Sequence, residues 1–174
     1  MYRFLKKYHY LLITFMTLAA MFAVMSVDKY LQNTTSPHGI LDFEFAKTSQ
    51  RAFYILQDWG ITGQKYAAFS LGIDYLFLVF YTLFFMISVY KVAENNHFLV
   101  GKLALPFSLL FLTAGIYDAL ENYFLLSIIV EKASSQTPLY AYISAASKFV
   151  SIAIGLAFLT AALLWKVLKK LSRT

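Results

Sequence analysis

Long apolar stretches alternate with shorter polar ones along this chain, and four such stretches occur. They cover about residues 9–27, 64–90, 103–130 and 138–165. An α-helix needs roughly 20 apolar residues to cross the hydrocarbon core of a bilayer, and each stretch is close to or above that length. The pattern therefore predicts an all-α polytopic membrane protein, with four transmembrane helices in an up-down bundle within a single domain, 1–174.

The one long segment outside these spans, residues 28–63, separates the first two and is expected to form the outer loop. In it Ala52, Ile55, Leu56 and Trp59 recur at i, i+3, i+4 and i+7, opposite polar residues. This spacing predicts an amphipathic helix.

Capping residues mark the ends of this helix, because Thr48 or Ser49 can accept its first amide protons and Gly60 can stop it. The helix can lie in the membrane interface, which is the simpler interpretation, or cover the bundle as a lid. The covering residues would then be Phe53, Ile55, Leu56 and Trp59. Upstream, apolar and acidic residues partly alternate in Ile40–Phe45, which favours an extended or interfacial piece.

Composition supports a membrane protein and excludes several function classes. The 174 residues are 60% hydrophobic and 18% aromatic, far above soluble averages, and too few remain for a soluble catalytic domain. The chain has no cysteine, which excludes disulfides and thiolate chemistry. Because His9, His38 and His97 fall at span ends or in loops, we expect no metal site and no cofactor.

The distribution of Lys and Arg predicts the orientation of the chain. Nine of the 15 lie in residues 1–10, 91–102 and 166–174, and five lie in residues 28–65 and 131–137. Basic residues favour the cytoplasmic side, so we expect both termini in the cytoplasm. In a bacterium, the membrane would be the inner one and the long loop would face the periplasm. The net charge of +6 then reflects topology and lipid headgroups, so membrane lipids are the expected partners and nucleic acid is not.

Polar residues interrupt the third span at Asp118, Glu121 and Asn122. Asp118 and Asn122 are one helical turn apart, with Glu121 beside them and Gly115 one turn earlier. An acid at the bilayer centre costs about 2.5–3.5 kcal/mol, so these acids should face the bundle interior. Gly115 should let a neighbouring helix approach on that face.

Ionisable residues on three spans are predicted to share one layer. Measured from the outer ends at about 1.5 Å per residue, Asp74, Asp118, Glu121 and Lys148 all lie roughly 14–18 Å deep. We expect Lys148 to pair with Asp118 or Glu121, because a lysine in low dielectric loses its proton or keeps a carboxylate close. The remaining acids require a proton, a cation or a cationic ligand.

The predicted ligand-binding layer therefore comprises Asp74, Asp118, Glu121, Asn122 and Lys148. Helical spacing adds Tyr81, Tyr117, Ser144, Ser147 and Ser151 as lining residues. The serines of span four are small enough to serve packing alone, and no histidine stands near them to act as a base.

Three strings of residues resemble a known group of proteins. Gly-Ile-Leu-Asp-Phe-Glu-Phe-Ala at 39–46, Gly-Ile-Asp-Tyr-Leu-Phe at 72–77 and Asp-Ala-Leu-Glu-Asn at 118–122 together resemble a group of uncharacterised small bacterial integral membrane proteins. The likeness implies the four-span layout and no activity.

Three functions fit these observations. The first, which we favour, is a bundle that binds a lipid or another hydrophobic small molecule, with the acids on its polar head. The second is an intramembrane enzyme that modifies a lipid with one protonated and one ionised carboxyl group. The third is a structural or accessory subunit in which the polar layer only fixes the packing.

Overall fold

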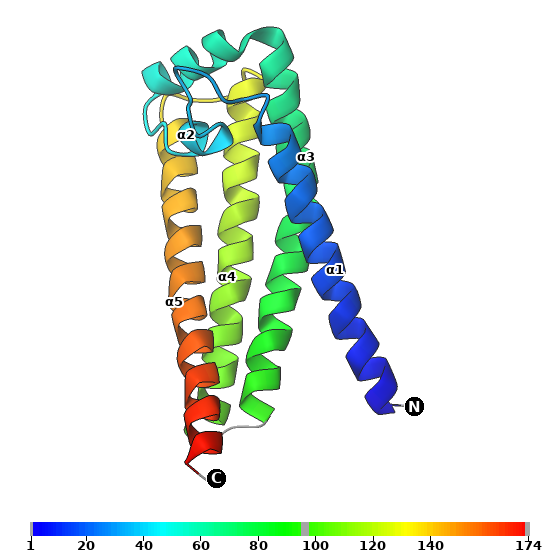
Figure 1. Cartoon of the computed structure of the whole chain (residues 1–174). Helices are drawn as coiled ribbons and strands as arrows, with labels where there is room; N and C mark the ends of the chain where they lie inside the picture. The colour runs from blue at the N-terminus through cyan, green and yellow to red at the C-terminus, as the bar shows by residue number, and fades with distance from the viewer. Residues whose placement is uncertain (1, 95–97, 173–174) are drawn as a thin grey trace.

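The computed structural model describes residues 2–94 and 98–172, with the backbone alone for residues 2–7, 98–100 and 170. The helices in order are α1 (Tyr2–Asp28), α2 (Ile40–Glu44), α3 (Ser49–Glu94), α4 (Phe98–Ile129) and α5 (Thr137–Leu171). Four of them are long and apolar enough to cross a membrane, and the described ranges contain no strand (Figure 1). The predicted all-α fold with four spans is confirmed. Part of the connection predicted between spans two and three, residues 95–97, lies outside the described residues.

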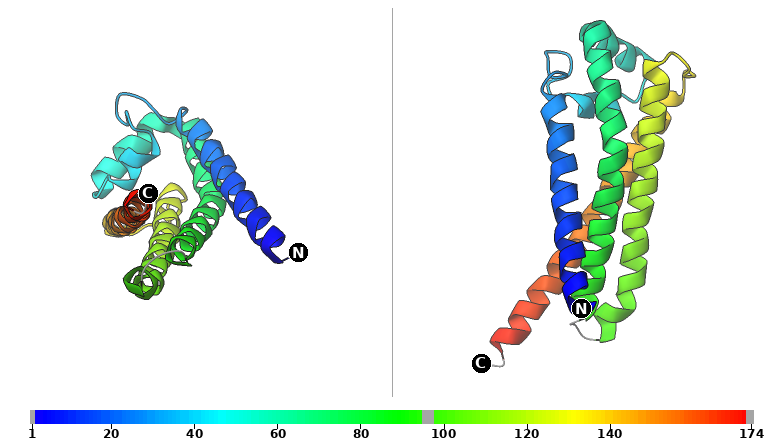
Figure 2. Two further views of the ribbon diagram at one scale, coloured as in Figure 1. Left: turned by 60° about the horizontal axis from the view of Figure 1, so that its bottom comes forward. Right: turned by 90° about the vertical axis from the view of Figure 1, so that its right-hand side faces the viewer.

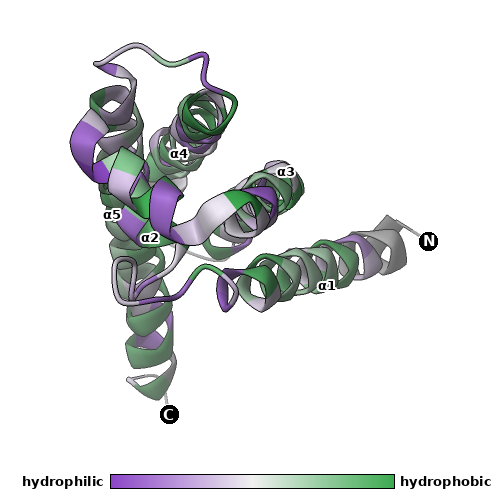
Figure 3. Cartoon of the chain, turned by 90° about the horizontal axis from the view of Figure 1, so that it is seen from above, coloured by the Kyte–Doolittle hydropathy of each residue, from purple (hydrophilic) through white to green (hydrophobic). Residues whose placement is uncertain are grey.

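The long helices form an up-down bundle in which α4 is central. It packs along both α3 and α5, whereas α1 packs mainly along α3 (Figure 1). Figures 2 and 3 show the N-terminal end of α1 pointing away from α5, and Figure 3 shows mostly apolar residues along the long helices. Many α1 side chains are consequently exposed, Phe22 by 74%.

Gly60 divides α3 into two parts, as the sequence predicts. Its backbone has φ 59° and ψ −173°, a conformation that side chains other than hydrogen disfavour. The part before Gly60 crosses the end of the bundle, and the part after it descends as a span (Figure 1). At the start of α3 the amide of Arg51 donates to Oγ1 of Thr48 at 3.3 Å, which confirms Thr48 as a cap.

The amphipathic part of α3 covers the bundle. Ala52, Ile55 and Trp59 are buried in one apolar cluster with residues of the outer loop, α4 and α5, and Leu56 packs against that cluster. Phe53 is 61% exposed, so it is not buried with Ala52 and Ile55, although it lines a cavity beside Ala52 and Leu56. It lies one position after Ala52 and thus about 100° around the helix.

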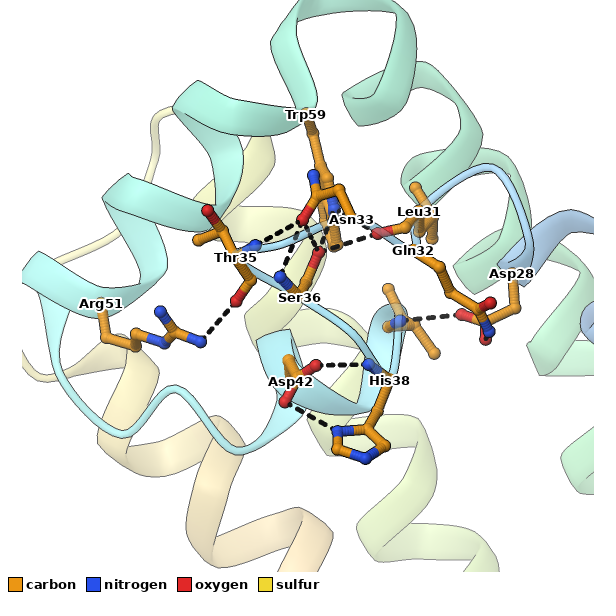
Figure 4. Close-up of polar contacts among 11 residues, drawn as sticks. Asp28, Leu31, Gln32, Asn33, Thr35, Ser36, His38, Asp42, Arg51 and Trp59 are labelled. Carbon is orange, nitrogen blue, oxygen red and sulfur yellow. Dashed lines mark hydrogen bonds and ion pairs between the residues drawn. The ribbon is translucent and has the colours of Figure 1, made fainter.

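The prediction of an extended piece at Ile40–Phe45 is also wrong, because Ile40–Glu44 forms α2. Local side-chain bonds favour the helix over an extended strand (Figure 4). The carboxylate of Asp28, at the end of α1, accepts the amide of Ile40 at 2.8 Å. The amide of His38 donates to Oδ2 of Asp42 at 2.6 Å. The first bond satisfies an amide that the helix start leaves without a partner, and the second ties Asp42 of α2 to the backbone just before the helix.

The loop before α2 is fixed to the covering helix by buried polar contacts (Figure 4). Nε1 of Trp59 donates to the carbonyl oxygen of Leu31 and to Oγ of Ser36, both at 2.8 Å. Oδ1 of Asn33 accepts the amides of Thr35 at 3.0 Å and of Ser36 at 2.7 Å. The loop and the first part of α3 therefore form one cap over the bundle.

Candidate functional site

Lys148 of α5 is the centre of a buried charge cluster. Its Nζ lies 2.7 Å from Oε2 of Glu121 and 3.1 Å from Oδ1 of Asp118, both on α4. It also lies 3.7 Å from Oε2 of Glu44 at the end of α2. All four residues are buried. The predicted pairing of Lys148 with Asp118 or Glu121 is confirmed, and Lys148 contacts both.

The contact between α4 and α5 brings these groups together because small residues surround it. Ser144 and Ser151 are buried on α5, about one turn to either side of Lys148. Further along α5, a side chain at Gly155 would collide with the ring of Phe111. Small residues let helices approach closely in a membrane, so that opposite charges on the two helices come within bonding distance.

A second branch of the polar layer links α3 to α4. Nδ2 of Asn122 donates to Oδ2 of Asp74 at 2.7 Å. The hydroxyl of Tyr81 donates to Oδ2 of Asp118 at 2.9 Å, so this carboxylate receives one bond from α3 and one from Lys148. The predicted layer therefore consists of two bonded sets, Asp74 with Asn122, and Lys148 with Asp118, Glu121 and Tyr81.

Glu44 is the residue of the cluster that the sequence prediction missed. It lies in a five-residue helix outside the spans, where an acidic side chain is ordinarily solvated. Glu44 is buried because α2 packs against the bundle beneath the cap. This packing depends on contacts between residues far apart in the sequence. The only local signal is its place between Phe43 and Phe45.

The predicted lining residues do not all face the cluster. Ser144 and Ser151 are buried, Ser147 is partly buried, and Tyr81 is 3% exposed. Tyr117 is 37% exposed and is not buried with the residues of the cluster. Next to Asp118 in the helix, its side chain emerges on the outer side of α4.

The cluster contains more acids than bases. Lys148 faces the carboxyl groups of Glu44, Asp118 and Glu121, and Oε1 of Glu121 is buried without a hydrogen bond from any described residue. Uncompensated charge in a low dielectric is costly. The surplus negative charge of the carboxyl groups must therefore be neutralised by protons or by an additional cation. Among the described residues, no group of three or more His, Cys, Asp and Glu has an arrangement that could hold a metal ion.

An apolar groove runs along the contact between α3 and α4. It has a volume of about 440 Å³. We call it the α3–α4 groove, and its lining includes Leu78, Val79, Thr82, Gly115, Ile116 and Ala119. Oγ1 of Thr82 is buried there without a hydrogen bond to any described residue. Thr82 and Ala119 follow Tyr81 and Asp118 in the chain, about 100° around each helix, and no residue of the charge cluster lines the groove.

No known family model, curated protein or solved structure matches this chain. The resemblance to a group of small bacterial membrane proteins therefore stays a prediction.

Proposed function

We propose that the charge cluster binds the head of a membrane-dissolved amphiphile that carries a cationic or hydrogen-bond-donating group. The observation that carries this proposal is the gathering of three carboxyl groups on the single ammonium group of Lys148. A cationic head would balance the charge that Lys148 leaves uncompensated.

The α3–α4 groove supports an amphiphile over a small polar ion. Its walls are apolar, and the exposed side chains of Val79 and Ile116 lie at its edge, so it opens toward the lipid. An acyl or ring system in the groove would lie at about the same depth in the bilayer as Tyr81 and Asp118, because Thr82 and Ala119 are only one residue further along the helices. Thr82 offers a buried hydroxyl for one polar atom of the ligand.

The proposed orientation places the ligand in the outer leaflet. With both termini in the cytoplasm of a bacterium, the cap and α2 lie on the outer side of the inner membrane. The cluster then lies in the outer half of the bilayer, where a lipid of that leaflet reaches it from the side.

The test is mass spectrometry of the small molecules that co-purify with the protein in mild detergent. Glu44→Gln removes one carboxylate while leaving Lys148 with Asp118 and Glu121, and Asp58→Asn removes an exposed acid of the cap as the control. We expect an amphiphilic amine or a similar donor on the unaltered protein and on Asp58→Asn. Its amount should fall about tenfold in Glu44→Gln, since bonds to charged groups contribute about 1.5–3 kcal/mol.

Two outcomes would overturn the proposal. One is the absence of any such molecule from the unaltered protein, and the other is its equal retention in all variants, including Asp118→Asn with Glu121→Gln. Conversion of the bound molecule during incubation would favour the intramembrane enzyme instead.

A further inference from the structure

A second cavity lies between α1, α3 and α5 at the end of the bundle away from the cap. Its volume is about 620 Å³. Its polar wall is formed by Tyr10 of α1, Ser88, Lys91 and Glu94 of α3, and Lys166 of α5. At about 1.5 Å per residue, Lys166 is roughly 27 Å along α5 from Lys148, so this crevice is separate from the charge cluster.

The divergence of α1 from α5 leaves this crevice, because α1 packs mainly on α3 (Figures 1 and 3). Contacts within the crevice order the wall that α1 and α3 share. Nζ of Lys91 lies 3.5 Å from the ring centroid of Tyr10, whose hydroxyl lies 3.1 Å from Oγ of Ser88. The ring of Tyr10 also stacks on that of Phe84, with the centroids 5.6 Å apart.

The crevice changes from apolar to charged along its length. Leu156 and Phe84 line it nearer the middle of the bundle, and Lys91 and Lys166 line it toward the end. The distance from Leu156 to Lys166 is about 15 Å along the helix axis. This order is that of a phospholipid, whose acyl chains lie toward the membrane centre and whose phosphate lies at its edge.

The net charge of the residues that line the crevice is opposite and equal to that of one phosphodiester group. Lys91 and Lys166 contribute two positive charges and Glu94 one negative charge, which leaves a net charge of +1. Basic pockets between transmembrane helices on the cytoplasmic side bind anionic lipid headgroups. We propose that the crevice binds an anionic phospholipid of the inner leaflet, with its phosphate between Lys91 and Lys166 and an acyl chain along Leu156 and Leu163.

Native mass spectrometry can test this site with phosphatidylglycerol and phosphatidylcholine as the probes. The protein, delipidated in detergent, would be titrated with each lipid. Lys91→Gln with Lys166→Gln removes the two charges of the crevice, and Lys102→Gln with Lys169→Gln removes two charges that do not line it. We expect phosphatidylglycerol to bind more tightly than phosphatidylcholine. Its dissociation constant should rise about tenfold or more in the crevice pair and much less in the control pair.

A second variant tests the apolar part of the site. Leu163 is 50% exposed, so Leu163→Trp should fold and partly fill the crevice while both lysines remain. We expect it to weaken phosphatidylglycerol binding as well. Any of three results would overturn the proposal. The two double lysine variants could weaken phosphatidylglycerol binding equally, the two lipids could bind equally well, or Leu163→Trp could bind phosphatidylglycerol as tightly as the unaltered protein. None of these outcomes bears on the charge cluster, since no residue of that cluster is altered.

Discussion

Nζ of Lys148 lies 2.7 Å from Oε2 of Glu121, and this contact joins α5 to α4 inside the bundle. Glu121 is fully buried and Lys148 is 7% exposed. An ion pair with so little access to water depends on geometry, because the desolvation of both groups must be offset by their mutual contacts.

The first prediction concerns removal of the base. Lys148→Met should lower the free energy of unfolding by about 3–5 kcal/mol, because Glu44, Asp118 and Glu121 then lose their common counter-charge. Denaturant unfolding in detergent micelles measures this loss. Lys132→Met, in the exposed loop between α4 and α5, is the control and should change stability by less than about 0.5 kcal/mol.

The second prediction concerns coupling within the pair. Glu121→Gln combined with Lys148→Met should be more stable than the sum of the two single losses implies, since each single change leaves a buried charge without its partner. A double-mutant cycle measures this coupling. The same cycle can be run with Asp118→Asn in place of Glu121→Gln. If the stability losses of the single variants simply add in both cycles, Lys148 does not bond to either acid.

The third prediction concerns Gly115. A Cβ atom there would lie 2.5 Å from Oγ1 of Thr82, so Gly115→Ala should force α3 and α4 apart and cost about 1–3 kcal/mol. Adding Thr82→Ala should recover part of the loss. Gly72→Ala is the matched control, because nothing lies within 4 Å of its Cβ position and the helix gains up to about 1 kcal/mol. Thermal unfolding ranks the variants by stability. An equal change in unfolding temperature for Gly115→Ala and Gly72→Ala would contradict the close approach at Gly115.

The fourth prediction concerns Trp59. Its Nε1 bonds to Leu31 and Ser36 inside the cap, so its fluorescence should be blue-shifted and protected from an aqueous quencher. Trp165, which is 54% exposed, is first replaced by Phe so that Trp59 alone emits. Ser36→Ala should increase quenching. If the aqueous quencher reduces Trp59 fluorescence strongly even with Ser36 in place, the cap is open to solvent.

The fifth prediction concerns orientation. Thr34 is exposed at the capped end and Ser172 is exposed at the other end. On this cysteine-free background, Thr34→Cys should react with a membrane-impermeant thiol reagent from outside intact cells, and Ser172→Cys should react only after lysis. The reverse pattern would place the cap in the cytoplasm and overturn the proposed access from the outer leaflet.

Several features of this fold were predictable from residues close together in the sequence. The length of each apolar stretch predicts a span, and Thr48 and Gly60 mark the first part of α3. The facing of Asp118 and Glu121 toward Lys148 was also predictable. An ionised side chain that faces lipid is costly, so an acid on a span should face the bundle interior, and helical periodicity then shows which residues share that face.

The sequence by itself determined the four helices and the layer in which their charges meet, because both depend on local periodicity and on depth in the bilayer. Only the tertiary structure decided that α2 brings Glu44 to Lys148, that Phe53 and Tyr117 point outward, and that α1 diverges from α5. These features depend on contacts between residues far apart in the chain. Periodicity within one segment does not specify which neighbour its side chains meet.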